Sequence, residues 1–146
     1  MTHVRKQIRE TLREWLALAL PEYDVFASRK FARNVTEKPI IDMRFLNENI
    51  DSEVMGSDRR RRASLYLRVQ RAAPETQIDD LLDDDEVSIN DVVMSDDWWQ
   101  GLLTEPPEQM QVNWSDTDAG GQIIGSIVLR YDVEYRVTQT DLETAR

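Results

Sequence analysis

The clearest structural pattern in this chain is IIGSIVLRYDVEYRV at residues 123–137. From residue 126 the chain alternates, with Ile127, Leu129, Tyr131, Val133, Tyr135 and Val137 on one side and Ser126, Val128, Arg130, Asp132, Glu134 and Arg136 on the other. A period of two over this length predicts a β-strand with one buried face and one face toward water or a partner. The stretch is about twice the usual strand length of ~5–6 residues. A strand that extends beyond its neighbours in the sheet has unpaired backbone N–H and C=O groups that another chain can bind. The pattern therefore favours an assembling protein. A long strand bent near Gly125 is the alternative.

Earlier segments predict further strands and the turns between them. The segments are Tyr23–Phe26, residues 40–46 with Ile41, Met43 and Phe45 on one face, residues 63–70 with Leu65, Leu67 and Val69 inward, and residues 109–114 with Met110, Val112 and Trp114 on one face. The polar segment Asn47–Arg62 predicts an enlarged loop at the tip of an antiparallel hairpin. Ser115–Gly121 predicts a polar turn that pairs the last strand with residues 109–114.

Two long helices are predicted from apolar residues at three- and four-residue spacing. The first runs from Val4 to Leu20, with Thr2 as its N-cap and Pro21 ending it. The second follows Pro74 and continues to about Ser95, and two acidic residues, Asp85 and Glu86, interrupt its apolar stripe, so a break or an exposed turn is predicted there. Residues 97–103 predict a short helix. The fold class is therefore α+β: one domain of residues 1–146, with a mainly antiparallel sheet, two main helices on one face and a long C-terminal β-hairpin.

The charge is divided between the two halves of the chain. Residues 1–71 carry 15 Lys or Arg against 10 Asp or Glu, whereas residues 72–146 carry 3 against 18. No basic side chain occurs between Arg71 and Arg130. Such a distribution argues against a general nucleic-acid binder, which carries a basic face and a high pI. It suits either a subunit whose basic surface meets an acidic surface of a neighbour, or charge that only keeps the protein soluble.

Residues suited to catalysis are scarce. The chain has no cysteine and one histidine, His3, which has no obvious orienting partner. The acidic run from Asp79 to Glu86 is contiguous, so its carboxylates fan around a helix and do not converge on a Mg²⁺ or Ca²⁺ ion. Residues 116–121 begin like a calcium loop but have Ile127 at the twelfth position, where a glutamate is required. No nucleotide-binding glycine motif is present. We therefore expect no enzyme activity and no cofactor or metal.

Several residues are candidates for contact with a partner. The Arg59–Arg62 run could touch phosphates or an acidic partner, or form only a solvated loop. Trp98 and Trp99 are the most suggestive binding feature, because tryptophan is enriched at interface hot spots, although cover within the chain is the alternative. The outward side of the last strand completes the set with Arg130, Asp132, Glu134 and Arg136.

Nearly the whole chain resembles a family of small bacteriophage tail proteins in the order of its segments and in their general residue pattern. The residues that carry the resemblance are LPEY at 20–23, VFASR at 25–29, PIIDMR at 39–44, WW at 98–99, QVNWS at 111–115 and GSIVLRY at 125–131. Together they resemble the tail terminators of long-tailed phages, the minor tail protein U group of lambda-like phages. The second predicted helix, which follows Pro74, is more acidic here than is expected for that group.

The resemblance implies an α+β subunit that forms a hexameric ring on the last ring of tail-tube protein. Such a ring stops tube polymerisation and then offers a surface to the head–tail connector. The implied location is the head-proximal end of the virion tail, after synthesis in the host cytoplasm. No apolar run approaches the ~20 residues that cross a bilayer, and Thr2–Glu14 lacks a signal-peptide core. Alternatives are a neck or head-completion protein, an acidic DNA mimic using residues 79–97, and a metal-dependent nuclease.

Overall fold

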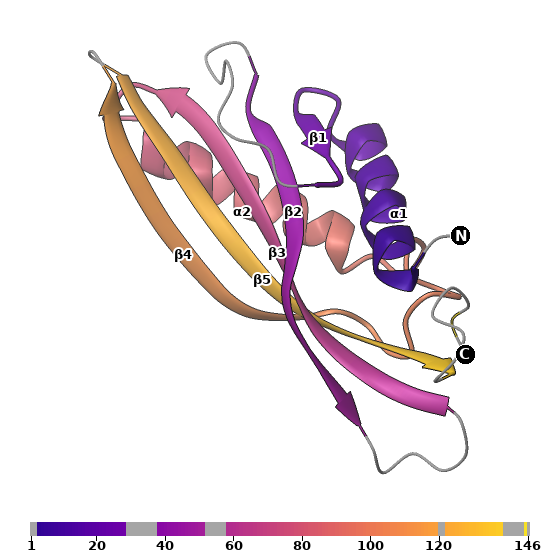
Figure 1. Cartoon of the computed structure of the whole chain (residues 1–146). Helices are drawn as coiled ribbons and strands as arrows, with labels where there is room; N and C mark the ends of the chain where they lie inside the picture. Colours follow the sequence, from indigo (N-terminus) through magenta and orange to yellow (C-terminus); the bar gives the residue numbers. More distant parts are fainter. Residues whose placement is uncertain (1–2, 29–37, 52–57, 120–121, 139–144, 146) are drawn as a thin grey trace.

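The computed structural model describes residues 3–28, 38–51, 58–119, 122–138 and 145. Within these described residues, two helices and five strands follow one another (Figure 1). They are α1 (Val4–Ala19), β1 (Asp24–Phe26), β2 (Ile40–Asp51), β3 (Asp58–Ala73), α2 (Ile78–Val93), β4 (Glu108–Ala119) and β5 (Gln122–Thr138). The strands form one sheet in the order β1-β2-β3-β5-β4, and every neighbouring pair is antiparallel except the short parallel pair β1–β2. The predicted α+β class is confirmed.

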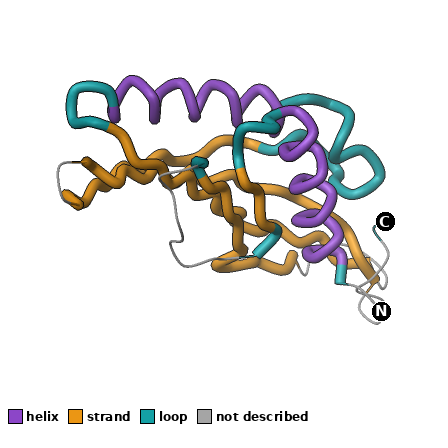
Figure 2. Tube along the Cα trace, turned by 90° about the horizontal axis from the view of Figure 1, so that it is seen from above, coloured by secondary structure: helices purple, strands orange, loops and turns teal. Residues whose placement is uncertain are grey.

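Both helices lie on the same face of the sheet (Figure 2). The buried stripe of α1 is Val4, Ile8, Leu12 and Leu16, and that of α2 includes Ile78, Leu82, Ile89 and Val93. These side chains form one hydrophobic cluster with the inward residues of β3 and β5, among them Leu65, Leu67, Ile127 and Leu129. The apolar residues that a period of 3.6 predicts in the helices and a period of two predicts in the strands therefore pack together in a single layer between helices and sheet.

β5 has the alternation that its sequence predicts, but most of its backbone is already paired within the sheet. Its inward residues from Ile127 to Val137 are all buried. β3 pairs with it along its length, from Ala73↔Ile123 to Asp58↔Thr138, and β4 pairs with its other edge from Gln122 to Asp132. Beyond that point the amide of Thr104 donates to the Glu134 carbonyl at 2.9 Å. The expectation that this strand leaves its backbone groups for another chain is therefore wrong over most of its length. The outermost long strand is β4.

The β-structure is more extensive than its sequence predicts. Residues 47–51 and 58–62, predicted as a polar loop, continue β2 and β3, and the remaining tip lies outside the described residues. Likewise β4 continues to Ala119 through most of the predicted turn, so the β4–β5 hairpin is long and tightly connected. A register shift between Phe45 and Asn47 lets β2 bend without ending.

The helix ends and turns also differ in detail from prediction. The N-cap of α1 is His3, whose Nδ1 accepts a hydrogen bond from the Arg5 amide at 3.0 Å; Thr2, the predicted cap, lies outside the described residues. α2 is continuous through Asp85 and Glu86, because Asp85 is buried and paired where a break was predicted. Residues 97–102 form turns and not the predicted short helix.

Gly125 allows α2 to lie close to β5. A Cβ atom at this position would come within 2.7 Å of Ile78 Cγ1 and 3.0 Å of Leu82 Cδ1. We expect Gly125→Ala to lower the free energy of unfolding by about 1–3 kcal/mol, the usual cost of overpacking a core. Urea denaturation would measure it. In an Ile78→Ala background the same alanine should cost less, because the nearer of the two close side chains is gone and the Leu82 contact at 3.0 Å remains. Equal costs in the two backgrounds would contradict this close approach.

Candidate assembly surfaces

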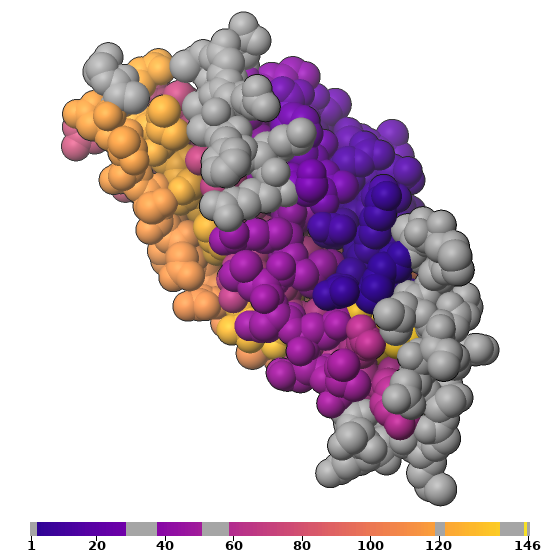
Figure 3. All heavy atoms as spheres, in the orientation of Figure 1, coloured from indigo at the N-terminus to yellow at the C-terminus, as the bar shows by residue number. Residues whose placement is uncertain are grey.

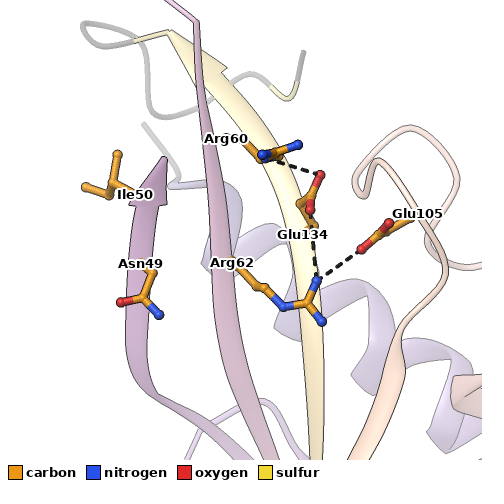
Figure 4. A pocket seen from close by; sticks show the side chains of 6 residues that line it. All are labelled: Asn49, Ile50, Arg60, Arg62, Glu105 and Glu134. Atoms are coloured by element: carbon orange, nitrogen blue, oxygen red, sulfur yellow. Dashed lines mark hydrogen bonds and ion pairs between the residues drawn. The ribbon is translucent and has the colours of Figure 1, made fainter. Parts of the chain in front are cut away.

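The face of the sheet opposite the helices carries a network of arginines and carboxylates centred on Arg62. The β3–β5 register places this residue opposite Glu134. Its guanidinium donates to Glu108 at 3.0 Å and lies 3.6 Å from Asp132. It also donates to Glu105 at 3.2 Å and lies 4.0 Å from Glu134, as Figure 4 shows. Burial alone would lower the pKa of Arg62, but the hydrogen bond to Glu108 and the surrounding carboxylates raise it overall. The cation is therefore held within its own chain.

The network extends along both strands. Arg60 lies 3.9 Å from Glu134, and Arg130 donates to Asp132 at 3.2 Å. Asp132 also accepts from the Ser64 hydroxyl at 3.0 Å and is only 9% exposed, although it lies on the outward side of the strand. A hollow of about 440 Å³ opens beside these groups, lined by Asn49, Ile50, Arg60, Arg62, Glu105 and Glu134 (Figure 4).

The structure brings together most of the candidate residues from the last strand but divides the arginine run. Arg60 and Arg62 point to the network, and Arg136 lies opposite Arg60 in the register. Arg59 and Arg61 alternate to the other side of β3, where Arg61 forms an ion pair with Glu48 at 3.0 Å. The interpretation of Arg59–Arg62 as a solvated loop is wrong, because β3 holds all four residues and three of them form ion pairs with described carboxylates.

The two adjacent tryptophans lie away from this network, in the turn after α2. Trp98 is 2% exposed, and its Nε1 donates to the Val93 carbonyl at 2.9 Å. Trp99 is partly buried and packs against the same hydrophobic core. Trp98 is therefore covered within the chain, as the alternative interpretation expected.

Among the described residues, the most exposed tryptophan belongs to the face that the sequence predicts for residues 109–114. Trp114 on β4 is 59% exposed, and Met110 on the same strand is 46% exposed. The register puts Trp114 opposite Ile127, on the helix side of the sheet, and a shift between Gln109 and Gln111 displaces Met110 from the alternation. The predicted common face is therefore confirmed for Val112 and Trp114 and wrong for Met110, and the pattern contains no signal that β4 is the edge strand.

Neither a metal cluster nor a membrane helix is found in the part of the chain that the structure describes. No group of three or more His, Cys, Asp or Glu side chains there could hold a metal ion. His3 serves as the N-cap of α1, and burial together with the charge of Arg5 lowers its pKa. No helix among the described residues is long and apolar enough to cross a membrane.

The sequence matches no model of a known protein family, and no curated protein sequence matches it either. Two surfaces stand out: the exposed edge strand β4 and the arginine–carboxylate network on the outward face of β3 and β5.

Proposed function

We propose that this protein is a structural subunit that assembles with other proteins and catalyses no reaction. The observation that carries the proposal is the exposed edge of β4. A long outer strand with free backbone groups and a large exposed tryptophan is a ready template for pairing with another chain. Trp114 is 59% exposed and Met110 on the same strand is 46% exposed, and tryptophan is enriched among the residues that contribute most to binding at interfaces.

Within this class, the resemblance in residues favours a bacteriophage tail terminator. The subunits form a ring, a hexamer in that group, at the head-proximal end of the tail. One side of the ring copies the interface between rings of tail-tube protein, and the other side presents a different surface to the head–tail connector. The mechanism is steric: the tube stops growing because its next binding surface is gone. The protein needs no cofactor for this function.

The β4 edge gives a direct test. Trp114→Ala should weaken binding to tail-tube protein by about thirtyfold, which corresponds to a hot-spot cost of about 2 kcal/mol. Its stability should change by no more than about 0.5 kcal/mol, because the side chain contributes little to the core. Titration calorimetry with tail-tube protein would measure the affinity. Leu18→Ala is the matched control, since Leu18 is 82% exposed but lies on α1.

A neck or head-completion protein is the near alternative, and it differs in its partner. If Trp114→Ala weakened binding to connector protein while wild type ignored tube protein, the neck function would replace the terminator. An acidic DNA mimic is favoured by one observation, the exposed aspartates of α2. Loss of binding to a basic DNA-binding protein on neutralising Asp83 and Asp84, with virion assembly intact, would support the mimic.

A further inference from the structure

A basic hollow lies between α1 and β2. It has a volume of about 270 Å³ and is lined by His3, Arg5, Lys6, Arg9, Arg44 and Phe45. In Figure 3 the N-terminal part of α1, in indigo, lies directly beside β2, in purple. The lining contains four cationic side chains and no carboxylate. We call this surface the basic hollow.

The cations of the basic hollow are poorly neutralised within the chain. Among the described residues, the side chains of Arg9 and Arg44 have no hydrogen-bond or ion-pair partner, and the buried Nε of Arg9 has no acceptor. The nearest carboxylates to Arg5 and Lys6 are long contacts, Glu48 at 3.8 Å and Glu10 at 3.9 Å. A buried N–H without an acceptor costs free energy, so an incoming carboxylate would be stabilising here.

The complementary surface is the outer side of α2, which Figure 2 shows lying across the sheet. Its exposed residues include Asp79, Asp80, Asp83, Asp84 and Asp91, which we call the acidic face. Within the described part of the chain none of these five aspartates has an ion-pair partner, in keeping with the lack of Lys or Arg from 72 to 129. Val87, 62% exposed, lies among them and gives the face an apolar centre.

We propose that the acidic face of one copy docks into the basic hollow of the next copy. Arg5 and Arg9 on α1 and Asp80 and Asp84 on α2 are each one turn apart, so both charge rows repeat at about 6 Å and can be paired in register. Val87 can then meet Phe45, the apolar member of the hollow. A second copy fits better than nucleic acid, because the net charge of −10 repels phosphates. The contact joins two different surfaces, and such a head-to-tail contact gives a ring where the rotation between copies closes and an open filament where it does not. The location of such a ring at the end of a phage tail rests on the proposed function.

Two charge-reversal variants test this contact. Variant A carries Lys6→Glu, Arg9→Glu and Arg44→Glu, which leaves Arg5 as the remaining arginine of the lining and makes the hollow acidic. Variant B carries Asp80→Lys, Asp83→Lys, Asp84→Lys and Asp91→Lys, which leaves Asp79 as the remaining carboxylate of the acidic face and makes the face of α2 basic. Each alone should weaken self-association by about tenfold or more, because attraction between copies becomes repulsion. An equimolar mixture should restore assembly to the wild-type level, since every A–B contact again joins unlike charges. Light scattering would measure the mass, and circular dichroism would confirm that each variant folds.

The control is Arg13→Glu with Glu14→Lys, an exposed ion pair on α1 outside the hollow, which should leave assembly unchanged. Wild-type association should also weaken between about 0.05 M and 0.5 M salt, as the Debye length shortens. A wild type that stays monomeric at low salt, variants that assemble normally, or a mixture that stays dissociated would each overturn the contact. So would binding of duplex DNA by wild type that variant A loses. Binding to tail-tube protein reports separately on the proposed function, because Trp114 lies outside both charged surfaces.

Discussion

Replacing Asp85 by alanine should lower the free energy of unfolding by about 3 kcal/mol, because the change leaves the Arg71 cation without its partner in the interior. Asp85 is 1% exposed and accepts two hydrogen bonds from the Arg71 guanidinium, at 2.6 and 2.7 Å. The Tyr23 hydroxyl donates to the same carboxylate. Burial and this hydrogen bond raise the pKa of Tyr23. Urea denaturation would measure the loss of stability.

Two further variants separate the ion pair from simple loss of a side chain. Arg71→Met combined with Asp85→Leu should bring stability back near wild type, since apolar residues of similar volume often replace a buried pair without loss. Asp84→Ala, on the exposed side of the same helix, should change stability by no more than about 0.5 kcal/mol. If Asp85→Ala were as mild as Asp84→Ala, the buried ion pair would not exist as described.

Trp98→Ala should cost about 3–5 kcal/mol, the range for removing a large aromatic side chain from a core. The indole is nearly inaccessible, and its donated hydrogen bond to Val93 ties the turn after α2 to the end of that helix. Thermal and urea unfolding would both show the loss. The exposed Trp114→Ala variant is the matched control for stability, with an expected change of no more than about 0.5 kcal/mol. A Trp98→Ala protein of normal stability that only failed to bind a partner would show that Trp98 is a contact residue instead.

The helices and the inward sides of the strands follow from periodicity. The stripe from Val4 to Leu16 and the alternation from Ile127 to Val137 each bury one side, so local pattern and tertiary packing agree. The same reasoning places Leu65, Leu67 and Val69 in the core. Such elements are predictable because neighbouring residues in the chain carry the whole signal.

The rest depends on contacts between distant residues. Arg61 and Arg62 look like loop residues in sequence, but Glu48 and Glu134 on neighbouring strands pair with them and let β2 and β3 continue. In the sequence, Asp85 only interrupts an apolar stripe. In the fold, Arg71, fourteen residues earlier, lies beside it and donates to its carboxylate. The edge position of β4 follows from strand order, which composition does not reveal. The basic hollow likewise needs α1 and β2 to be placed side by side.

Electron microscopy of tail-tube protein polymerised with and without this protein is the most direct test of the central claim. We predict rings of this protein at one end of the tubes and arrested growth wherever a ring is present. Tubes that grow to the same length with bare ends at every concentration of the protein would contradict a terminator.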